Sequence, residues 1–296
     1  MTTDRPIAGH IHPLADGLAC VLAPNPSMMT YWGTNTYLLG HDSVAVIDPG
    51  PDDPAHRAAL MDAIGGRPVS HILVTHSHLD HSGGARNLAN QVGAPVLAFG
   101  DSHAGRSAVM QALGDLGGGE GVDTTFAPDQ TVTTGDMIEG DGWALDVMHT
   151  PGHFGNHLCF IWGDAAFTGD LVMGWASSLV SPPDGDISDF MTSCRTLAKR
   201  DLTCAYAGHG APIPDAHARI AHLIAHRQSR EKALLSALRS GPASAAALTR
   251  TLYHDTPMTL LAMAERNVLA QLIDLWSRTC VIPSGPISSR TVFRLK

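Results

Sequence analysis

The sequence predicts an α/β protein with a larger domain at residues 1–216 and a smaller, mainly helical domain at residues 217–296. Short apolar runs typical of strands alternate with helical patterns over the first part of the chain. Several of these runs end at a His or Asp side chain next to a glycine. After residue 216 the pattern becomes helical, and Lys and Arg outnumber Asp and Glu by 11 to 4, against 8 to 24 before it.

The elements expected in the larger domain come in a mixed order. Residues 53–64 and 84–92 predict helices, the first of which stops at Gly65-Gly66. Residues 95–99 predict a short strand, and residues 136–147 predict paired strands around a Gly-Asp-Gly turn. Residues 175–186 are expected to form a loop, which could be a plain connector or carry specificity.

The smaller domain begins with one long helix, predicted over residues 216–240 and ended by Gly241-Pro242. Its apolar residues have helical spacing: Ile220, Leu223, Ile224, Leu234, Leu235 and Leu238. Two more helices are expected at residues 243–253 and 258–278, and a hairpin at residues 281–294. Helices followed by a terminal hairpin predict a winged-helix-like C-terminal domain.

The most informative motif is His76-Ser77-His78-Leu79-Asp80-His81, directly after the apolar run 71–75 and before Gly83-Gly84. It puts three imidazoles and a carboxylate on a loop at the end of a strand. Imidazole nitrogen and carboxylate oxygen are the ligands of zinc sites that keep an open position for chemistry, and closed structural sites usually contain Cys. The motif therefore predicts a catalytic metal centre rather than a solvated loop.

Three further residues stand in matching contexts, each after a strand-like run and beside a glycine. They are His153 in a Thr-Pro-Gly-His segment, Asp170 in Thr-Gly-Asp, and His209 in Ala-Gly-His-Gly. Glycine permits tight turns and a close approach of the backbone to a site. Seven donors are too many for one tetrahedral ion and suit two.

These motifs, in this order, closely resemble those of the metallo-beta-lactamase superfamily over about residues 30–215. The resemblance implies an αββα sandwich with a two-metal site at one edge, and a hydrolase that uses a hydroxide held by both metals, oriented by Asp80. His76, His78 and His153 would hold the first metal; Asp80, His81 and His209 the second; Asp170 would bridge them. His78 stands where diiron relatives typically have Glu, which favours two zinc ions over iron or manganese.

The C-terminal part resembles, more loosely, one branch of the superfamily, beta-lactamase-like protein 2, which includes an endoribonuclease. The branch tends to place a second His four residues after the first, here His157, which we expect to assist catalysis as an acid. A phosphate-binding surface would be formed by Arg219, Arg227, Arg230, Lys232 and Arg239; the competing interpretation is a solvated helix face.

Composition is that expected of a cytoplasmic enzyme. The N-terminal segment 1–6 does not have the pattern of a signal peptide, and no apolar run is as long as a membrane span. Five scattered cysteines without a Cys-x-x-Cys motif indicate thiols in a reducing compartment. These features make a periplasmic antibiotic-resistance role less plausible.

Several functions stay open at this point. The leading interpretation is a phosphodiesterase or endoribonuclease acting on RNA. The alternatives are a hydrolase of small thioesters or lactones resembling glyoxalase II, a persulfide dioxygenase with one iron, and a non-catalytic reader with a metal domain. The expected partner is thus a small molecule or RNA, with no membrane, and the C-terminal domain could serve as the surface of a homodimer.

Overall fold

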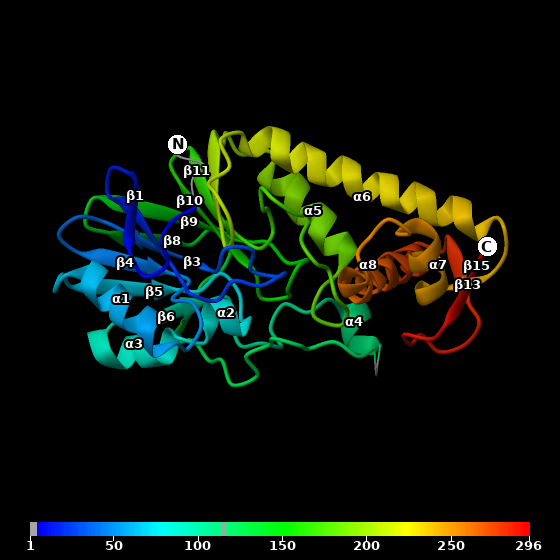
Figure 1. Ribbon diagram of the computed structural model, residues 1–296, viewed down its shortest axis with the longest axis horizontal. Helices are drawn as coiled ribbons and strands as arrows, with labels where there is room; N and C mark the ends of the chain where they lie inside the picture. Colours follow the sequence, from blue (N-terminus) through cyan, green and yellow to red (C-terminus); the bar gives the residue numbers. More distant parts are fainter. Residues whose placement is uncertain (1–4, 114–115) are drawn as a thin grey trace.

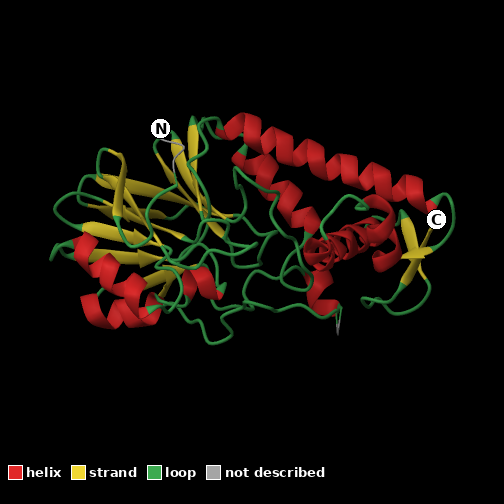
Figure 2. Cartoon of the chain, viewed as in Figure 1, coloured by secondary structure: helices red, strands yellow, loops and turns green. Residues whose placement is uncertain are grey.

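The computed structural model describes residues 5–113 and 116–296 (Figure 1). Residues 1–4, which carry most of the segment used above to argue against a leader, lie outside the described part. The molecule is elongated, with strands gathered at one end and a group of helices at the other (Figure 2). Among the described residues no helix is long and apolar enough to cross a bilayer.

Two mixed sheets form the first end of the molecule. The larger has the order β1 (Ile11–Ala15), β2 (Leu18–Leu22), β3 (Asn35–Leu39), β4 (Val44–Ile47), β5 (Val69–Leu73), β6 (Val96–Ala98) and β7 (Gln130–Thr131). The smaller has the order β12 (Cys204–Ala207), β11 (Ala165–Gly169), β10 (Leu158–Trp162), β9 (Trp143–His149) and β8 (Met137–Gly140). Strands β4 to β7 run parallel to one another, as do β11 and β12.

The sheets pack face to face through one apolar core. In β9, Trp143, Leu145 and Val147 point into it while Ala144 between them is exposed, the period-two pattern of a half-buried strand. Tyr37 of β3 meets Phe167 of β11 across the interior, with ring centroids 5.2 Å apart. This contact joins the two sheets close to the edge where the metal motifs end.

Helices cover both outer faces. Helices α1 (Pro54–Ile64) and α3 (Ala85–Val92) pack on the larger sheet. Helix α5 (Ile187–Leu197) packs on the smaller sheet. The side chain of Asp53 accepts a hydrogen bond from the backbone of His56 and so caps α1, which ends at Gly65 in the left-handed conformation, φ 64°. The helix–sheet–sheet–helix layering expected from the sequence is confirmed.

The sequence patterns did not predict three helices. These are α2 (Leu79–Ser82) inside the His motif, α4 (Ala108–Ala112) and α5. The first two are single turns, too short to carry a helical period, and α5 lies directly after the 175–186 loop. Helices α1 and α3 match their predicted ranges to within one residue.

The C-terminal part contains α6 (Ala216–Leu238), β13 (Ala243–Ser244), α7 (Ala245–Leu252), α8 (Met258–Ser277), β14 (Val281–Pro283) and β15 (Val292–Leu295). The three strands form a small sheet of order β13-β15-β14, so the expected hairpin is present with a third strand beside it. Helix α6 contributes Ile220 and Leu223 to the core around α5, and Leu234 and Leu238 to the C-terminal core. The division of the chain at residue 216 stays a prediction.

Candidate metal centre

The His motif sits at the end of β5, where the chain turns into α2. His76 and His81 are fully buried, and His78 is the residue before the first turn of α2. Because α2 begins at Leu79, Asp80 and His81 lie on its single turn. The larger sheet thus delivers four of the seven predicted side chains to one edge.

The smaller sheet delivers the other three to the same edge. His153 lies on the loop between β9 and β10, Asp170 follows β11, and His209 follows β12. Strands β11 and β12 are parallel, so their carboxyl ends meet side by side. A Cβ on Gly208 would lie 2.5 Å from Asp170 Oδ1 and 2.6 Å from the His81 ring, so only glycine fits between these side chains.

The seven side chains form three overlapping groups, and within each group the donor atoms lie within 4.8 Å of one another. The groups are His76, His78 and His153; His76, His81 and Asp170; and Asp80, His81 and His209. His78 Nδ1 lies 2.9 Å from His76 Nε2 and 3.1 Å from His153 Nε2. His209 Nε2 lies 3.3 Å from Asp80 Oδ2 and 3.4 Å from Asp170 Oδ2.

The donor set fits a pair of metal ions. The imidazole nitrogens of His76, His78 and His153 face one another with no carboxylate between them. Lone pairs that converge in this way suit a metal cation, which takes the place that a shared hydrogen would otherwise have. Asp170 contacts both sides of the cluster, at 3.8 Å to His153 Nε2 and 3.6 Å to His81 Nε2. Its Oδ1 is buried without a hydrogen-bond partner among the described residues, so it is left for a ligand.

Protonation differs between the two sides. Burial lowers the pKa of His76 and His153, and that of His78 to about 3, which leaves neutral imidazoles with free lone pairs. Burial also opposes a charge on His81, but Asp80, Asp48 and Asp170 overcome it and raise the pKa of His81 to about 9. The pKa of His209 is raised well above its usual value, against burial, by Asp170 and Asp80.

The carboxyls show the converse effect. Burial on its own would raise the pKa of Asp80 and of Asp170, but His81 and His209 hold the pKa of both below the usual range. Without a bound cation, therefore, protons on His81 and His209 balance the carboxylates of the buried Asp170 and the partly exposed Asp80. A metal ion would take over this balance and release those protons, as expected for ligands that bind only when deprotonated.

A second set of contacts orients the ligand rings. His81 Nδ1 lies 2.8 Å from Asp48 Oδ2, His153 Nδ1 donates to the Leu179 carbonyl at 2.7 Å, and His209 Nδ1 to that of Gly33 at 3.1 Å. In each case Nε2 is left facing the cluster. Asp48 accepts further hydrogen bonds from the backbone and hydroxyl of Thr75.

Asp48 is a site residue that motif reasoning missed. It belongs to the Val-Ile-Asp-Pro-Gly segment at the end of β4, which indicates a turn but no particular partner. Its backbone has φ 52°, in the left-handed region that non-glycine residues seldom adopt. A buried carboxylate held in that conformation is the structural feature that indicates its role in orienting His81.

His157, the expected acid, lies behind Asp170. It is fully buried, its Nε2 accepts from the Asp170 backbone N–H at 3.2 Å, and its Nδ1 is 2.9 Å from Thr150 Oγ1. Burial lowers its pKa well below the usual value, an effect increased by His153. His157 is therefore a neutral acceptor, and it is not among the described residues that line either cavity beside the cluster.

The cluster opens into a cavity of about 440 Å³. Five of the seven side chains form its floor, namely His78, Asp80, His153, Asp170 and His209. Its walls come from the loop at Met29-Thr30, residues 119–121, the 179–184 segment and helix α8, through Ala262, Met263 and Arg266. The 175–186 loop is thus part of the site, and the C-terminal part reaches it as well.

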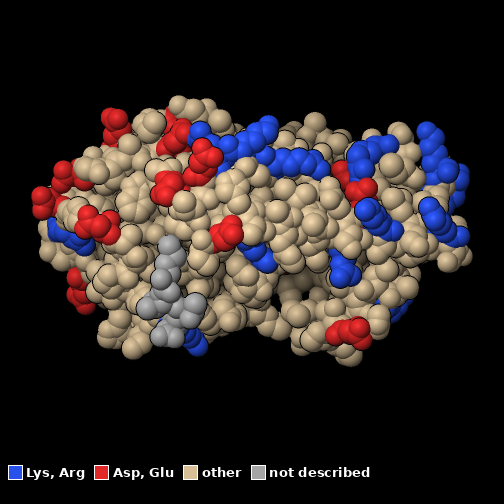
Figure 3. Space-filling view, turned by 90° about the horizontal axis from the view of Figure 1, so that it is seen from above, with Lys and Arg blue, Asp and Glu red and all other residues tan. Residues whose placement is uncertain are grey.

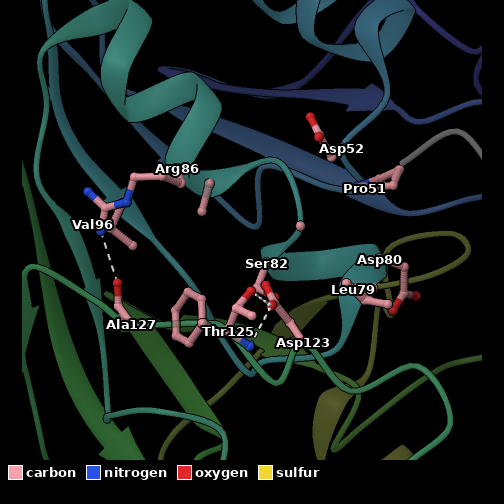
Figure 4. A pocket seen from close by; sticks show the side chains of 13 residues that line it. Pro51, Asp52, Leu79, Asp80, Ser82, Arg86, Val96, Asp123, Thr125 and Ala127 are labelled. Carbon is pink, nitrogen blue, oxygen red and sulfur yellow. Dashed lines mark hydrogen bonds between the residues drawn. The ribbon is translucent and has the colours of Figure 1, made fainter.

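A larger cavity, of about 550 Å³, lies beside α2, and Asp80 is the one cluster residue in its lining (Figure 4). Its lining is mixed, with apolar side chains such as Leu79, Val96 and Phe126 beside charged and polar ones that are already hydrogen-bonded. Arg86 donates to the Ala127 carbonyl at 2.9 Å, and Ser82 donates to Asp123 at 3.0 Å. The smaller cavity, with five cluster side chains in its floor, is the one that opens onto the candidate metal centre.

The phosphate-binding surface expected on α6 is only partly available. Arg227 is 5% exposed, with its guanidinium 5.0 Å from the centre of the Phe190 ring. Arg219 donates to the carbonyls of Met173 and Ala176, and Arg230 stacks on Tyr253. Arg227 was expected at the surface and is instead buried, because α5 and α8 pack on either side of it.

The metallo-beta-lactamase superfamily model matches residues 29–209, which include all seven cluster residues. Lactamase-like protein adaB from Aspergillus niger is 34% identical over 225 residues, which are 74% of this chain and 62% of that protein. An atrochrysone carboxyl ACP thioesterase from Claviceps purpurea is 28% identical over 242 residues, covering 80% of this chain and 70% of that protein. The chain thus spans less than two thirds of the length of the first of these relatives.

Solved structures extend the likeness to the C-terminal part. A metallo-beta-lactamase family protein from Thermus thermophilus has a TM-score of 0.77 at 28% identity, covering 96% of this chain and all of that one. A beta-lactamase domain protein from Burkholderia ambifaria shares the fold, with a TM-score of 0.79 at 21% identity, covering 98% of this chain and 95% of that one. These relatives do not point to the beta-lactamase-like protein 2 branch specifically. The chain belongs to the metallo-beta-lactamase superfamily.

Proposed function

We propose that the protein is a metal-dependent hydrolase of thioesters. The observation that carries the proposal is the pairing of a seven-residue His/Asp cluster with a cavity whose described walls are largely apolar and offer no free cation. Two relatives named as thioesterases, from Claviceps purpurea and Cryptosporiopsis, add support. Thioester hydrolysis, the alternative raised by the sequence, therefore moves ahead of RNA cleavage.

We assign the ligands as the sequence motifs suggested. His76, His78 and His153 would hold one ion, Asp80, His81 and His209 the other, and Asp170 would lie between them. Zinc is the metal we expect, with iron or manganese as alternatives for the same donors. When bound, two such ions supply a nucleophile from water near neutral pH and polarise the scissile carbonyl.

The chain's own residues have separate tasks in this proposal. Asp80 stays ionised beside His209, 3.3 Å away, so it can accept a hydrogen bond from the attacking water and orient it. His157 holds the backbone of Asp170 in place, since its Nε2 accepts from that N–H. The acid role first expected for His157 stays a prediction that a substitution can test.

The charges around the cavity favour an uncharged substrate. Glu120 and Asp184 stand in the walls in addition to Asp80 and Asp170 in the floor, and Arg266 is the only Lys or Arg among the described lining residues. The guanidinium of Arg266 already donates to Leu116, Gly117, Ser181 and Pro182. A polyanion would therefore meet carboxylates without a cation free to neutralise its phosphates.

A phosphodiesterase acting on RNA is the second candidate, favoured by the basic C-terminal part. In the view from above, Lys and Arg gather over α6 and the helices beyond it, and Asp and Glu gather over the sheet end (Figure 3). The order of elements from the end of α6 through β15 also supports the winged-helix-like domain predicted from the sequence. Lactone hydrolysis would use the same cavity. A persulfide dioxygenase with a single iron would use only some of the seven donors as ligands.

The test is a panel assay with metal-loaded protein against an acyl thioester, a lactone, bis-p-nitrophenyl phosphate and single-stranded RNA. We expect the highest kcat/KM on the thioester, and the loss of that activity in Asp80→Asn. RNA cleavage faster than thioester hydrolysis, abolished by the same substitution, would instead establish the second candidate.

A further inference from the structure

The walls of the cavity above the cluster, unlike its floor of predicted metal ligands, are side chains that would contact the rest of a substrate. Four chain segments far apart in sequence form them, and the apolar part comes from Met29, Leu179, Ala262 and Met263. Two of these four lie on α8, at the opposite end of the chain from Met29. At about 440 Å³ the cavity lies in the range of roughly 300–1,000 Å³ that buries most of a drug-sized ligand.

Helix α8 presents its wall residues on one face. Arg266 lies four positions after Ala262 and three after Met263, so its side chain falls between theirs on the side of the helix that lines the cavity. On other faces, Val268, Leu269 and Leu272 are buried in the C-terminal core, which anchors the helix. The wall is therefore part of a packed element rather than a free loop.

Arg266 ties the other walls to this helix. Its Nε donates to Ser181 Oγ at 2.9 Å, and its terminal nitrogens donate to the carbonyls of Leu116 at 2.6 Å and Gly117 at 3.0 Å, and to that of Pro182. A Cβ on Gly118 would lie 2.6 Å from Arg266 Nη2, so a glycine is required where the chain wraps around the guanidinium. The triple-glycine run at 117–119 thus serves to hold the cavity wall.

Most charged side chains in the walls already have partners within the protein. Asp184 pairs with Arg106 at 2.5 Å, and Arg266 is engaged as described, which leaves the exposed Glu120 as the one unpaired charge among the wall residues described. An occupant of this cavity finds two methionines, a leucine and an alanine beside it. Methionine is flexible and polarisable, and its sulfur makes favourable contacts with aromatic rings.

We propose that this cavity is the acyl pocket of the enzyme, and that Ala262 and Met263 of α8 set the size of the acyl group it accepts. The substrate class is a thioester of a bulky, uncharged and largely apolar acyl group, aromatic or branched, in preference to acetyl or other small acyl groups. The turnover test of this inference rests on the proposed thioesterase activity. The second test measures ligand binding alone and does not depend on that activity.

The turnover test compares two N-acetylcysteamine thioesters, of acetate and of naphthoate, on metal-loaded protein. Ala262→Phe fills the cavity, so the ratio of kcat/KM for naphthoyl over acetyl should fall by about tenfold or more, the size of effect that pocket shape exerts on an apolar group. Met263→Ala widens the cavity and should not lower that ratio. Ala221→Phe, on an exposed stretch of α6 outside the cavity, is the matched control and should keep the wild-type ratio.

The binding test uses the thioether analogue of the naphthoyl substrate, in which a methylene replaces the carbonyl, with titration calorimetry. Wild type and Ala221→Phe should bind it, and Ala262→Phe should bind it at least about tenfold more weakly with unchanged metal content. If no thioester is hydrolysed but this pattern of binding holds, the proposed activity fails and the pocket stands. If Ala262→Phe lowers turnover of both thioesters equally, or binds the analogue as wild type does, the acyl pocket is refuted.

Discussion

The side-chain oxygen of Asn267, on α8, accepts a hydrogen bond from the backbone N–H of Val180 at 3.0 Å. The same oxygen accepts from Arg227 of α6 at 2.8 Å, and Arg227 also donates to the carbonyl of Ser178. These hydrogen bonds hold Ser178 and Val180. Leu179 lies between them, and its carbonyl accepts the hydrogen bond from His153 Nδ1. The C-terminal helices thus hold the backbone that orients a predicted metal ligand.

Replacing Asn267 should weaken metal binding without removing a ligand. Asn267→Leu loses both hydrogen bonds to the side-chain oxygen and frees the 178–180 backbone, so His153 should lose its fixed orientation. Outer contacts of this kind are worth roughly 10–100-fold in metal affinity. Competition with a chromophoric chelator measures that loss.

Asn267→Asp is the matched control, because a carboxylate keeps both acceptor contacts and gives up only the donation to the Met263 carbonyl. It should retain most of the wild-type metal affinity. Equal losses in the two variants would mean that the packing of α8, rather than the hold on residues 178–180, governs the metal site.

The cluster could be predicted from the sequence, whereas its supports could not. His76, Asp80 and His153 follow strands, and a strand followed by a glycine turn is a local pattern that a sequence displays directly. Asp48 and Asn267 act through partners on other elements, so their roles depend on how the elements pack. Nothing in their immediate neighbours indicates that packing.

Helix α6 illustrates the same limit. Helical spacing correctly placed Ile220, Leu223 and Leu234 on the buried side. We expected Arg227 to be solvated, but it lies seven positions from both Ile220 and Leu234 and so shares their buried face. Phe190 of α5 and Asn267 of α8 contact its guanidinium there. The charge of the residue suggested exposure although its position on the helix suggested burial, and the partners that make the burial possible lie on other elements.

Asp170→Ala should lower metal occupancy on both sides of the cluster. Asp170 lies within 4 Å of His81, His153 and His209, so its loss removes a shared donor rather than a terminal one. Elemental analysis of wild type supplied with zinc should give two ions per chain, and the variant fewer. Asp123→Ala, which removes a carboxylate of the neighbouring cavity, should leave two ions bound. One ion per chain in fully loaded wild type would contradict the paired site.

Substitution of His157 separates an acid role from a positioning role. If His157 holds the Asp170 backbone, His157→Gln, which can still accept from that N–H, should keep more metal and activity than His157→Ala. The kcat pH profile should then keep its shape in both variants, because the buried, neutral imidazole releases no proton to substrate. Loss of one limb of the profile in His157→Gln, at full metal content, would restore the acid role.

The stability of the protein should fall in mild acid because of His56. This side chain is buried, its Nε2 lies 2.9 Å from Thr36 Oγ1, and its Nδ1 has no hydrogen-bond partner among the described residues. Burial lowers the pKa of His56 to about 4, and the nearby Asp53 only partly offsets this. Between pH 6.5 and about 4 the unfolded chain binds a proton that the folded chain does not, so unfolding becomes easier as the pH falls.

Urea titrations at pH 7 and pH 5, in His56→Gln and wild type with the same metal supply, isolate this contribution of His56. It should amount to roughly 2 kcal/mol of the wild-type loss and be absent from the variant. His103→Gln, at an exposed histidine, is the matched control and should lose as much stability as wild type. If His56→Gln shows the full wild-type loss, the proton is taken up elsewhere, and the imidazoles of the cluster become the first groups to test.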